Sequence, residues 1–184
     1  MPIFIGIFMN SRLAIKLQSN YSERDKAGIH SMKILVINGP NMNLLGLREP
    51  DIYGKQTYAD LVGILQEKAE ALGVEISFTQ SNHEGDLVDA IQGAYPHTDG
   101  IIINPAGYTF TSVAILDALK AVAIPAVEVH MSDLGKRDAF RQRSYVREVC
   151  IANCMGRGFE SYLEALDILV RFCSASADTN TKPE

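Results

Sequence analysis

The sequence contains few cysteines, and their arrangement argues against structural cross-links. Only three occur in 184 residues, Cys150, Cys154 and Cys173. Their number is odd, and none forms the C-x-x-C pair that is typical of zinc sites and redox-active disulfides. Two of them lie in or beside an apolar run. The pattern therefore indicates buried thiols in a reducing cytoplasm, and neither a disulfide framework nor a zinc centre is expected.

An excess of positive charge is also absent. The 17 Lys and Arg residues are outnumbered by 22 Asp and Glu residues, which gives a formal net charge of −5 and a pI near 5.4. Such a surface argues against nucleic acid or an anionic membrane as the main partner. A few local arginines can still reverse the field inside a cleft, so an acidic substrate is compatible with this composition.

No apolar run is long enough to cross a membrane. The first eight residues, MPIFIGIF, are apolar, but a spanning helix needs about 20 such residues, and the flanks do not match a secretion signal. Because Met32 directly precedes the first convincing strand, we interpret residues 1–31 as a mis-assigned start or a poorly ordered extension. The polar residues 174–184 are expected to form a disordered tail. Residues 32–173 then form a single domain.

Within this domain, short apolar runs alternate with segments of helical periodicity. Five strands are expected at Lys33–Asn38, residues 74–79, Gly100–Asn104, residues 126–129 and residues 149–154. Helices are expected at residues 57–73, 111–123 and 158–172, and another helix is expected to contain Leu87, Val88 and Ile91. Strands such as ILVIN and IIIN are apolar on both faces, which is typical of a parallel sheet covered by helices on both sides. The pattern predicts an α/β fold with a flavodoxin-like, doubly wound, five-stranded parallel sheet in the order 2-1-3-4-5.

The first helix has the clearest boundaries. Thr57 and Asp60 stand three residues apart in the positions of a capping box, which predicts the helix start. Gly73 follows the last periodic residue, where a glycine commonly ends a helix.

Polar residues follow three of the predicted strands directly. Asn41 lies in the Gly-Pro-Asn turn after the first strand, Asn104 ends the third, and His130 and Ser132 follow the fourth. In open α/β sheets the ligand lies outside the carboxyl ends of the strands, so we expect these side chains to share one site. Singly, the asparagines could be turn or cap residues, and His130 a hydrogen-bonded core residue. Their convergence from three segments favours a function.

The connection after the first strand is unusually long. It covers residues 39–56, where about 2–6 residues are usual in an α/β unit, and it contains Arg48 and Tyr53. We interpret it as a lid over the site. A second charged segment, with Arg137 and Arg141, follows the fourth strand, and a solvated helix face is the alternative interpretation of that segment.

Several familiar sites lack their signatures. No G-x-G-x-x-G follows a strand, and no G-x-x-x-x-G-K-[ST] occurs, so dinucleotide and Walker-type phosphate sites are not supported. A receiver domain needs aspartates where asparagines stand here, and a flavodoxin needs a Ser/Thr-rich loop after the first strand. The four histidines are scattered without metal-ligand spacing, and there is no G-x-S-x-G elbow.

Five segments resemble, in order and spacing, the type II 3-dehydroquinate dehydratases of the shikimate pathway. They are VINGPNMNLLGLREPDIYG, INPAGYTFTSVAILDAL, PAVEVHMSD, FRQRSY and GRGFESYLEAL, and the resemblance as a whole extends over residues 32–172. The resemblance implies a cytoplasmic hydro-lyase of chorismate and aromatic amino acid biosynthesis. It implies anti elimination of water from 3-dehydroquinate through an enolate, to give 3-dehydroshikimate, without a metal, an organic cofactor or a Schiff-base lysine. Family members are usually dodecamers, built as a tetramer of trimers.

The resemblance also implies roles for catalytic residues. Tyr53 corresponds to the tyrosinate base, Arg48 to the arginine that keeps it deprotonated, and Asn41 to the residue that holds a water at the enolate oxygen. His130 corresponds to the general acid, with Glu128 as its partner. These residue types suit the chemistry, because a guanidinium favours a phenolate and an imidazole titrates near neutral pH.

Further residues correspond to the substrate-binding groups of the family. The implied contacts come from Asn104, Ser132, Arg141 and the backbone at Met131. Arg137 corresponds to a lid arginine, and Asp117 to a residue that reaches the site of a neighbouring subunit.

Two departures from the family pattern affect the expectation. Phe110 stands where the family has a histidine that helps to hold the substrate, and residues 133–136 read Asp-Leu-Gly-Lys in place of Asn-Val-His-Ala. We expect a raised KM with the reaction type unchanged. The alternatives are a catalytically weakened relative and a small-molecule-binding module on the same fold.

Overall fold

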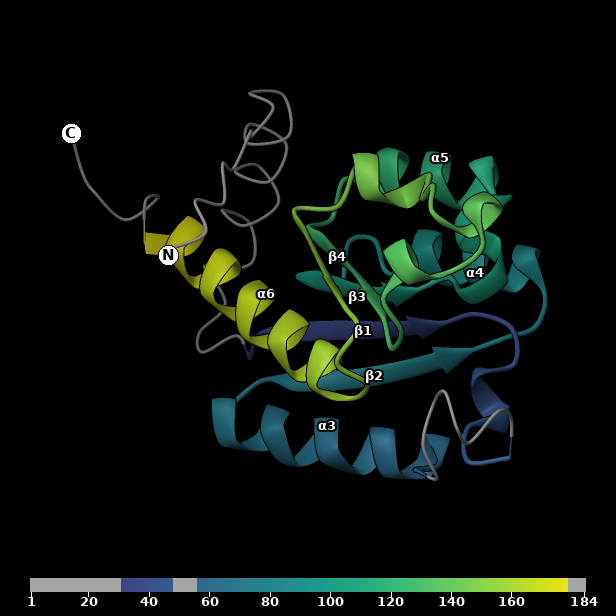
Figure 1. Ribbon diagram of the computed structural model, residues 1–184. Coiled ribbons are helices and arrows are strands. Elements are labelled where there is room, and N and C mark those ends of the chain that lie inside the picture. The colour runs from purple at the N-terminus through teal and green to yellow at the C-terminus, as the bar shows by residue number, and fades with distance from the viewer. Residues whose placement is uncertain (1–30, 48–55, 179–184) are drawn as a thin grey trace, which may run out of the picture.

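A five-stranded, all-parallel sheet forms the centre of the protein (Figure 1). The computed structural model describes residues 31–47 and 56–178. The strands are β1 (Lys33–Asn38), β2 (Glu75–Gln80), β3 (Gly100–Asn104), β4 (Ala126–His130) and β5 (Ala152–Met155). They pair in the order β2-β1-β3-β4-β5. The predicted fold class and strand order are confirmed.

Helices cover both faces of this sheet. Helices α3 (Tyr58–Leu72) and α6 (Glu160–Asp178) lie on one face, and α4 (Glu84–Gly93) and α5 (Val113–Val122) lie on the other (Figure 1). In the described part of the chain, no helix is both long and apolar enough to cross a bilayer.

Strand β1 shows why the sheet is covered on both sides. Ile34 and Val36 belong to the core under α3 and α6, whereas Leu35 and Ile37 belong to the core under α4 and α5. Successive side chains of a strand point to opposite faces, so an unbroken apolar run fills both cores. Burial of one such side chain stabilises the fold by about 1.5–3 kcal/mol.

The expected boundaries of α3 are confirmed. The Thr57 hydroxyl accepts a hydrogen bond from the Asp60 amide at 3.2 Å, and the Asp60 carboxylate accepts one from the Thr57 amide at 2.8 Å. Gly73 ends the helix at a φ of 69°, in the left-handed region that favours glycine.

Most of the other predicted boundaries differ by one or two residues, and two differ by more. Strand β5 begins at Ala152 rather than at residue 149, because Val149 and Cys150 pack against the core from a turn and not from a strand. Helix α6 continues beyond residue 172 to Asp178, into the segment expected to be a tail. The Ser176 hydroxyl there donates to the Phe172 carbonyl at 2.9 Å, a bond that lets a serine remain within a helix.

Candidate active site

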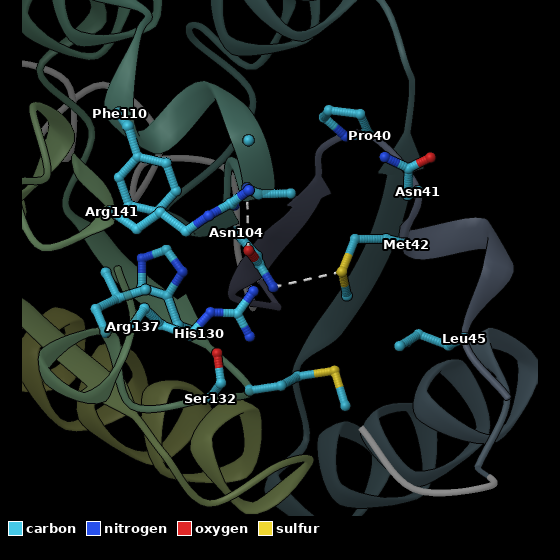
Figure 2. Close-up of a pocket in the computed structure, with 14 residues that line it drawn as sticks. Pro40, Asn41, Met42, Leu45, Asn104, Phe110, His130, Ser132, Arg137 and Arg141 are labelled. Atoms are coloured by element: carbon cyan, nitrogen blue, oxygen red, sulfur yellow. Dashed lines mark hydrogen bonds between the residues drawn. The ribbon is translucent and has the colours of Figure 1, made fainter. Parts of the chain in front are cut away.

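A pocket lies at the carboxyl ends of β1, β3 and β4, where the strand order reverses. Most of the residues predicted for the site line it: Asn41, Asn104, His130, Met131, Ser132, Arg137 and Arg141. Figure 2 labels all of them except Met131 and shows them around one opening. Four predicted residues are not in this lining. Arg48 and Tyr53 lie outside the described residues, Glu128 lies buried behind His130, and Asp117 is exposed on α5.

The backbone brings the loops after β1 and β3 into direct contact. The Gly39 amide donates to the Asn104 carbonyl at 2.8 Å, and a Cβ atom on Gly39 would lie 2.3 Å from the Pro105 oxygen. Only glycine fits this approach. Asn41 then adopts a φ of 67°, which asparagine tolerates better than most residues, and its amide donates to the Asn82 side chain at 2.9 Å.

Buried hydrogen bonds fix the floor of the pocket. The Asn104 amide nitrogen donates to the Tyr162 hydroxyl at 2.8 Å, and that hydroxyl donates to the Asn38 side chain at 2.6 Å. The Asn104 side-chain oxygen accepts from the Ala106 amide at 3.1 Å. Burial raises the pKa of Tyr162, so its phenol stays protonated and can donate. Sequence analysis missed Tyr162, although a tyrosine on the apolar face of a helix was a signal that its hydroxyl needs a buried partner.

A second buried network holds His130. Its Nε2 atom lies 2.7 Å from Oε1 of Glu128, which is fully buried, and Nε of Arg147 donates to Oε2 of Glu128 at 3.0 Å. Burial alone would raise the pKa of Glu128, but the hydrogen bond and charge of His130, with hydrogen bonds from Ser144 and Arg147, lower it. The carboxylate is therefore ionised. Sequence analysis gave Arg147 no role, because it lies 19 residues from Glu128.

The segment after β4 brings positive charge to the pocket. It forms short 3-10 turns, Leu134–Lys136 and Ala139–Arg141, so the alternative of a solvated charged helix is wrong. Arg137 and Arg141 both line the pocket (Figure 2). Two guanidinium groups attract an anionic ligand into a protein that carries a net negative charge.

The lining has the chemistry of a site for a small, oxygenated anion. It combines a carboxylate-held imidazole, a side-chain amide, a hydroxyl group and two arginines with an apolar wall. Among residues 31–47 and 56–178, no group of three His, Cys, Asp or Glu side chains could hold a metal ion.

Comparison with known proteins agrees with this description. The sequence model of the family described as dehydroquinase class II matches residues 32–170. The chain belongs to the class II dehydroquinase family.

Individual members of the family are similar over almost their whole length. The 3-dehydroquinate dehydratase of Geotalea daltonii is 53% identical over 135 residues, which are 73% of this chain and 94% of that protein. The one from Dinoroseobacter shibae is 48% identical over 136 residues, 74% of this chain and 91% of that protein. The crystal structure of a type II dehydroquinase from Butyrivibrio crossotus matches with a TM-score of 0.74 and 48% identity, covering 76% of this chain and 97% of that one.

Both segments that depart from the expected family pattern reach the pocket, since Phe110 and Leu134 contribute to its lining. The Arg141 guanidinium carbon lies 5.8 Å from the centre of the Phe110 ring (Figure 2). The same guanidinium lies 5.0 Å from the ring centre of Phe140. Arg141 is thus held by cation–π contacts beside Phe110, whose side chain has no hydrogen-bonding group.

Proposed function

We propose that this protein is a type II 3-dehydroquinate dehydratase, a hydro-lyase that removes water from 3-dehydroquinate to give 3-dehydroshikimate. Its family membership and the names of its curated relatives support the reaction. The observation that carries the proposal is the His130–Glu128 pair at a pocket lined by two arginines. Elimination of a hydroxyl group needs a positioned proton donor, and the substrate is a carboxylate.

The proposed elimination begins at C2, next to the ketone. Tyr53, as a phenolate, takes the C2 proton, and the electron pair moves onto the ketone oxygen to form an enolate. The cationic Arg48 favours the phenolate over the phenol. A water held by Asn41 stabilises the negative charge on the enolate oxygen, where the charge appears. The position of Asn41 at the pocket supports this last role.

The second half of the reaction takes place on the opposite face of the ring. His130, as an imidazolium, protonates the C1 hydroxyl group, and the enolate electrons form the C1–C2 double bond as water leaves. The ionised Glu128 supports this role, because a carboxylate 2.7 Å from Nε2 orients the imidazole ring and fixes which nitrogen faces the pocket. The overall result is an anti elimination.

The remaining pocket residues bind the substrate in this proposal. Arg141, Ser132, Asn104 and the backbone at Met131 hold its carboxylate and hydroxyl groups, and Arg137 covers them. Their common position around one pocket supports the assignment.

The proposal is tested by a steady-state assay of the purified full chain with 3-dehydroquinate. The conjugated enone product absorbs ultraviolet light, and we expect its absorbance to rise without added metal or nucleotide. Binding of 3-dehydroquinate without turnover would instead identify a catalytically weakened relative.

A substitution tests the role of the base. We expect Tyr53→Phe to abolish turnover while 3-dehydroquinate still binds, because the variant lacks only the phenolic oxygen. Calorimetry measures the binding, and Tyr95→Phe, at an exposed tyrosine, is the matched control. Normal turnover by the Tyr53 variant would remove this residue from its proposed role.

A further inference from the structure

Arg147 makes a contact that the proposed reaction does not explain. It lies in the 3-10 turn Val146–Glu148, outside the lining of the pocket, and its Nε atom donates to Oε2 of Glu128 at 3.0 Å. The other oxygen of the same carboxylate, Oε1, lies 2.7 Å from Nε2 of His130. Glu128 therefore bridges an arginine and the histidine that faces the pocket.

The burial of the Glu128 carboxylate and the His130 imidazole strengthens the electrostatic interactions of this bridge. The Glu128 side chain is fully buried and that of His130 is 6% exposed, whereas that of Arg147 is 37% exposed. Charges interact more strongly in a poorly solvated interior than in water. Among the described residues, the ion pair of the Arg147 side chain is with Glu128, and its Nη2 atom is buried without a hydrogen-bond partner.

We propose that Arg147 is a positioning residue that acts on His130 through Glu128. It fixes the position of the Glu128 carboxylate and interacts with part of its negative charge. The attraction between the carboxylate and the His130 imidazolium is thereby weakened. His130 then releases its proton to the leaving hydroxyl group more readily. The proposal rests on the proposed function, in which His130 is the proton donor.

The reason is the balance of charge around one buried carboxylate. A carboxylate paired only with an imidazolium stabilises the charged form, so the imidazolium becomes a weaker acid. A second cation on the same carboxylate opposes this effect through repulsion of the imidazolium and through competition for the carboxylate charge.

The other groups near Glu128 and His130 do not replace Arg147 in this balance. On the neighbouring strands, Glu128 stands opposite the neutral Asn153 and the apolar Ile103. Burial raises the pKa of the nearby Cys150 thiol, which therefore stays neutral, and Ser144 contributes a neutral hydrogen bond.

Two other cations lie near the imidazole. Arg137 and Arg141 line the same pocket as His130, and the segment Ala106–Phe110 adds the apolar ring of Phe110. These arginines repel the imidazolium as well, but among the described residues the Glu128 carboxylate forms its ion pairs with His130 and Arg147. Arg147 is the cation that shares that carboxylate.

The test compares Arg147→Gln with Arg143→Gln in the full-length enzyme. Arg143 carries the same charge on the same segment, but its guanidinium lies over the Tyr145 ring. Three quantities are measured: the pH at which the His130 imidazole titrates, by NMR without ligand, the pH profile of kcat/KM, and kcat. Arg147→Gln is expected to raise the His130 midpoint by about one pH unit, to move the corresponding limb of the profile equally, and to lower kcat roughly tenfold. Arg143→Gln is expected to change none of these quantities by more than a small fraction of this.

A conservative variant separates charge from structure. Arg147→Lys keeps the cation but not the planar donor, so we expect a shift in the same direction that is less than half as large. If Arg147→Gln and Arg147→Lys both titrate like the parent enzyme, the proposal is wrong, even if their melting temperatures fall. A smaller shift in Arg147→Gln than in Arg143→Gln would also overturn it.

The NMR titration keeps this test independent of the proposed function. A protein without turnover of 3-dehydroquinate would refute the function, while the His130 midpoint would still report whether Arg147 acts through Glu128. If Arg147→Gln does not fold, the Arg147→Lys titration decides the question by the same criterion.

Discussion

At the scale of single residues, Phe110 can be tested most directly, because the family resemblance predicts a histidine at this position. A ligand group that loses its hydrogen bond in a buried site costs about 1–3 kcal/mol, roughly fivefold to 150-fold in affinity. We expect Phe110→His to raise kcat/KM for 3-dehydroquinate by about fivefold or more, mainly through a lower KM. Steady-state kinetics measure this change.

A control for this prediction removes the ring without adding a donor. Phe110→Ala loses the contact with Arg141, which lies 5.8 Å from the ring centre. A cation–π contact of this kind is worth about 0.5–1 kcal/mol. We therefore expect Phe110→Ala to have a lower kcat/KM than the parent enzyme. An unchanged kcat/KM in Phe110→His would show that the phenylalanine costs this enzyme nothing.

The lowered pKa of Glu128 leads to a prediction of how the stability of the fold depends on pH. Its pKa in the folded protein is lowered from the usual value of 4.5, since its partners outweigh the effect of burial. A carboxyl group with a lowered pKa stabilises the fold above its unfolded-state pKa, and this contribution is lost as the pH falls through the folded-state pKa. We therefore expect the melting temperature to fall as the pH drops below about 4.5, and to fall less steeply in Glu128→Gln. Parallel pH dependences in the two proteins would contradict this.

At the scale of elements, the cap of α3 is a local source of stability. The Thr57 hydroxyl satisfies a helix amide that would otherwise lack a partner. Thr57→Ala should lower the free energy of unfolding by about 1 kcal/mol. Thr57→Ser keeps the hydroxyl group and should lower it by much less. Chemical denaturation measures both values. Equal losses in the two variants would mean that the methyl group of threonine matters more than its hydroxyl.

The elements also show what could be predicted from the sequence. The bounds of β1 and β3 were predicted correctly, because both are apolar runs that end at an asparagine next to a Gly or Pro turn. The start of β5 was predicted wrongly, because Val149 and Cys150 pack against the core although they precede the strand. Hydrophobicity reports burial, and only its periodicity reports the type of element.

Some residues of the pocket and its supporting network could likewise be predicted from the sequence, and others could not. Residues at the ends of β1, β3 and β4 could be predicted to converge, since parallel strands place their carboxyl ends at one edge. Arg147 and Tyr162 could not, because their partners Glu128 and Asn38 lie 19 and 124 residues away. No periodic pattern links such positions, so only the folded chain reveals the pairs.

At the scale of the whole molecule, Asp117 raises the question of assembly. It is exposed on α5 and is not part of the pocket lining, yet the family resemblance predicts that it reaches the site of a neighbouring subunit. We expect a dodecamer by light scattering, and Asp117→Asn should lower kcat/KM severalfold without changing the fold of its own subunit. A fully active monomer would contradict both expectations.

The absence of a side chain at Gly39 has a consequence for how this enzyme can change over time. The Pro105 carbonyl occupies the space that a methyl group would need, so main chain alone fixes how far apart the two asparagine-bearing turns stand. Substitutions elsewhere around the pocket can change which ligands bind without changing that spacing. We therefore expect changes of specificity to be tolerated on the side of Arg137 and Arg141, and substitutions of Gly39 not to be tolerated.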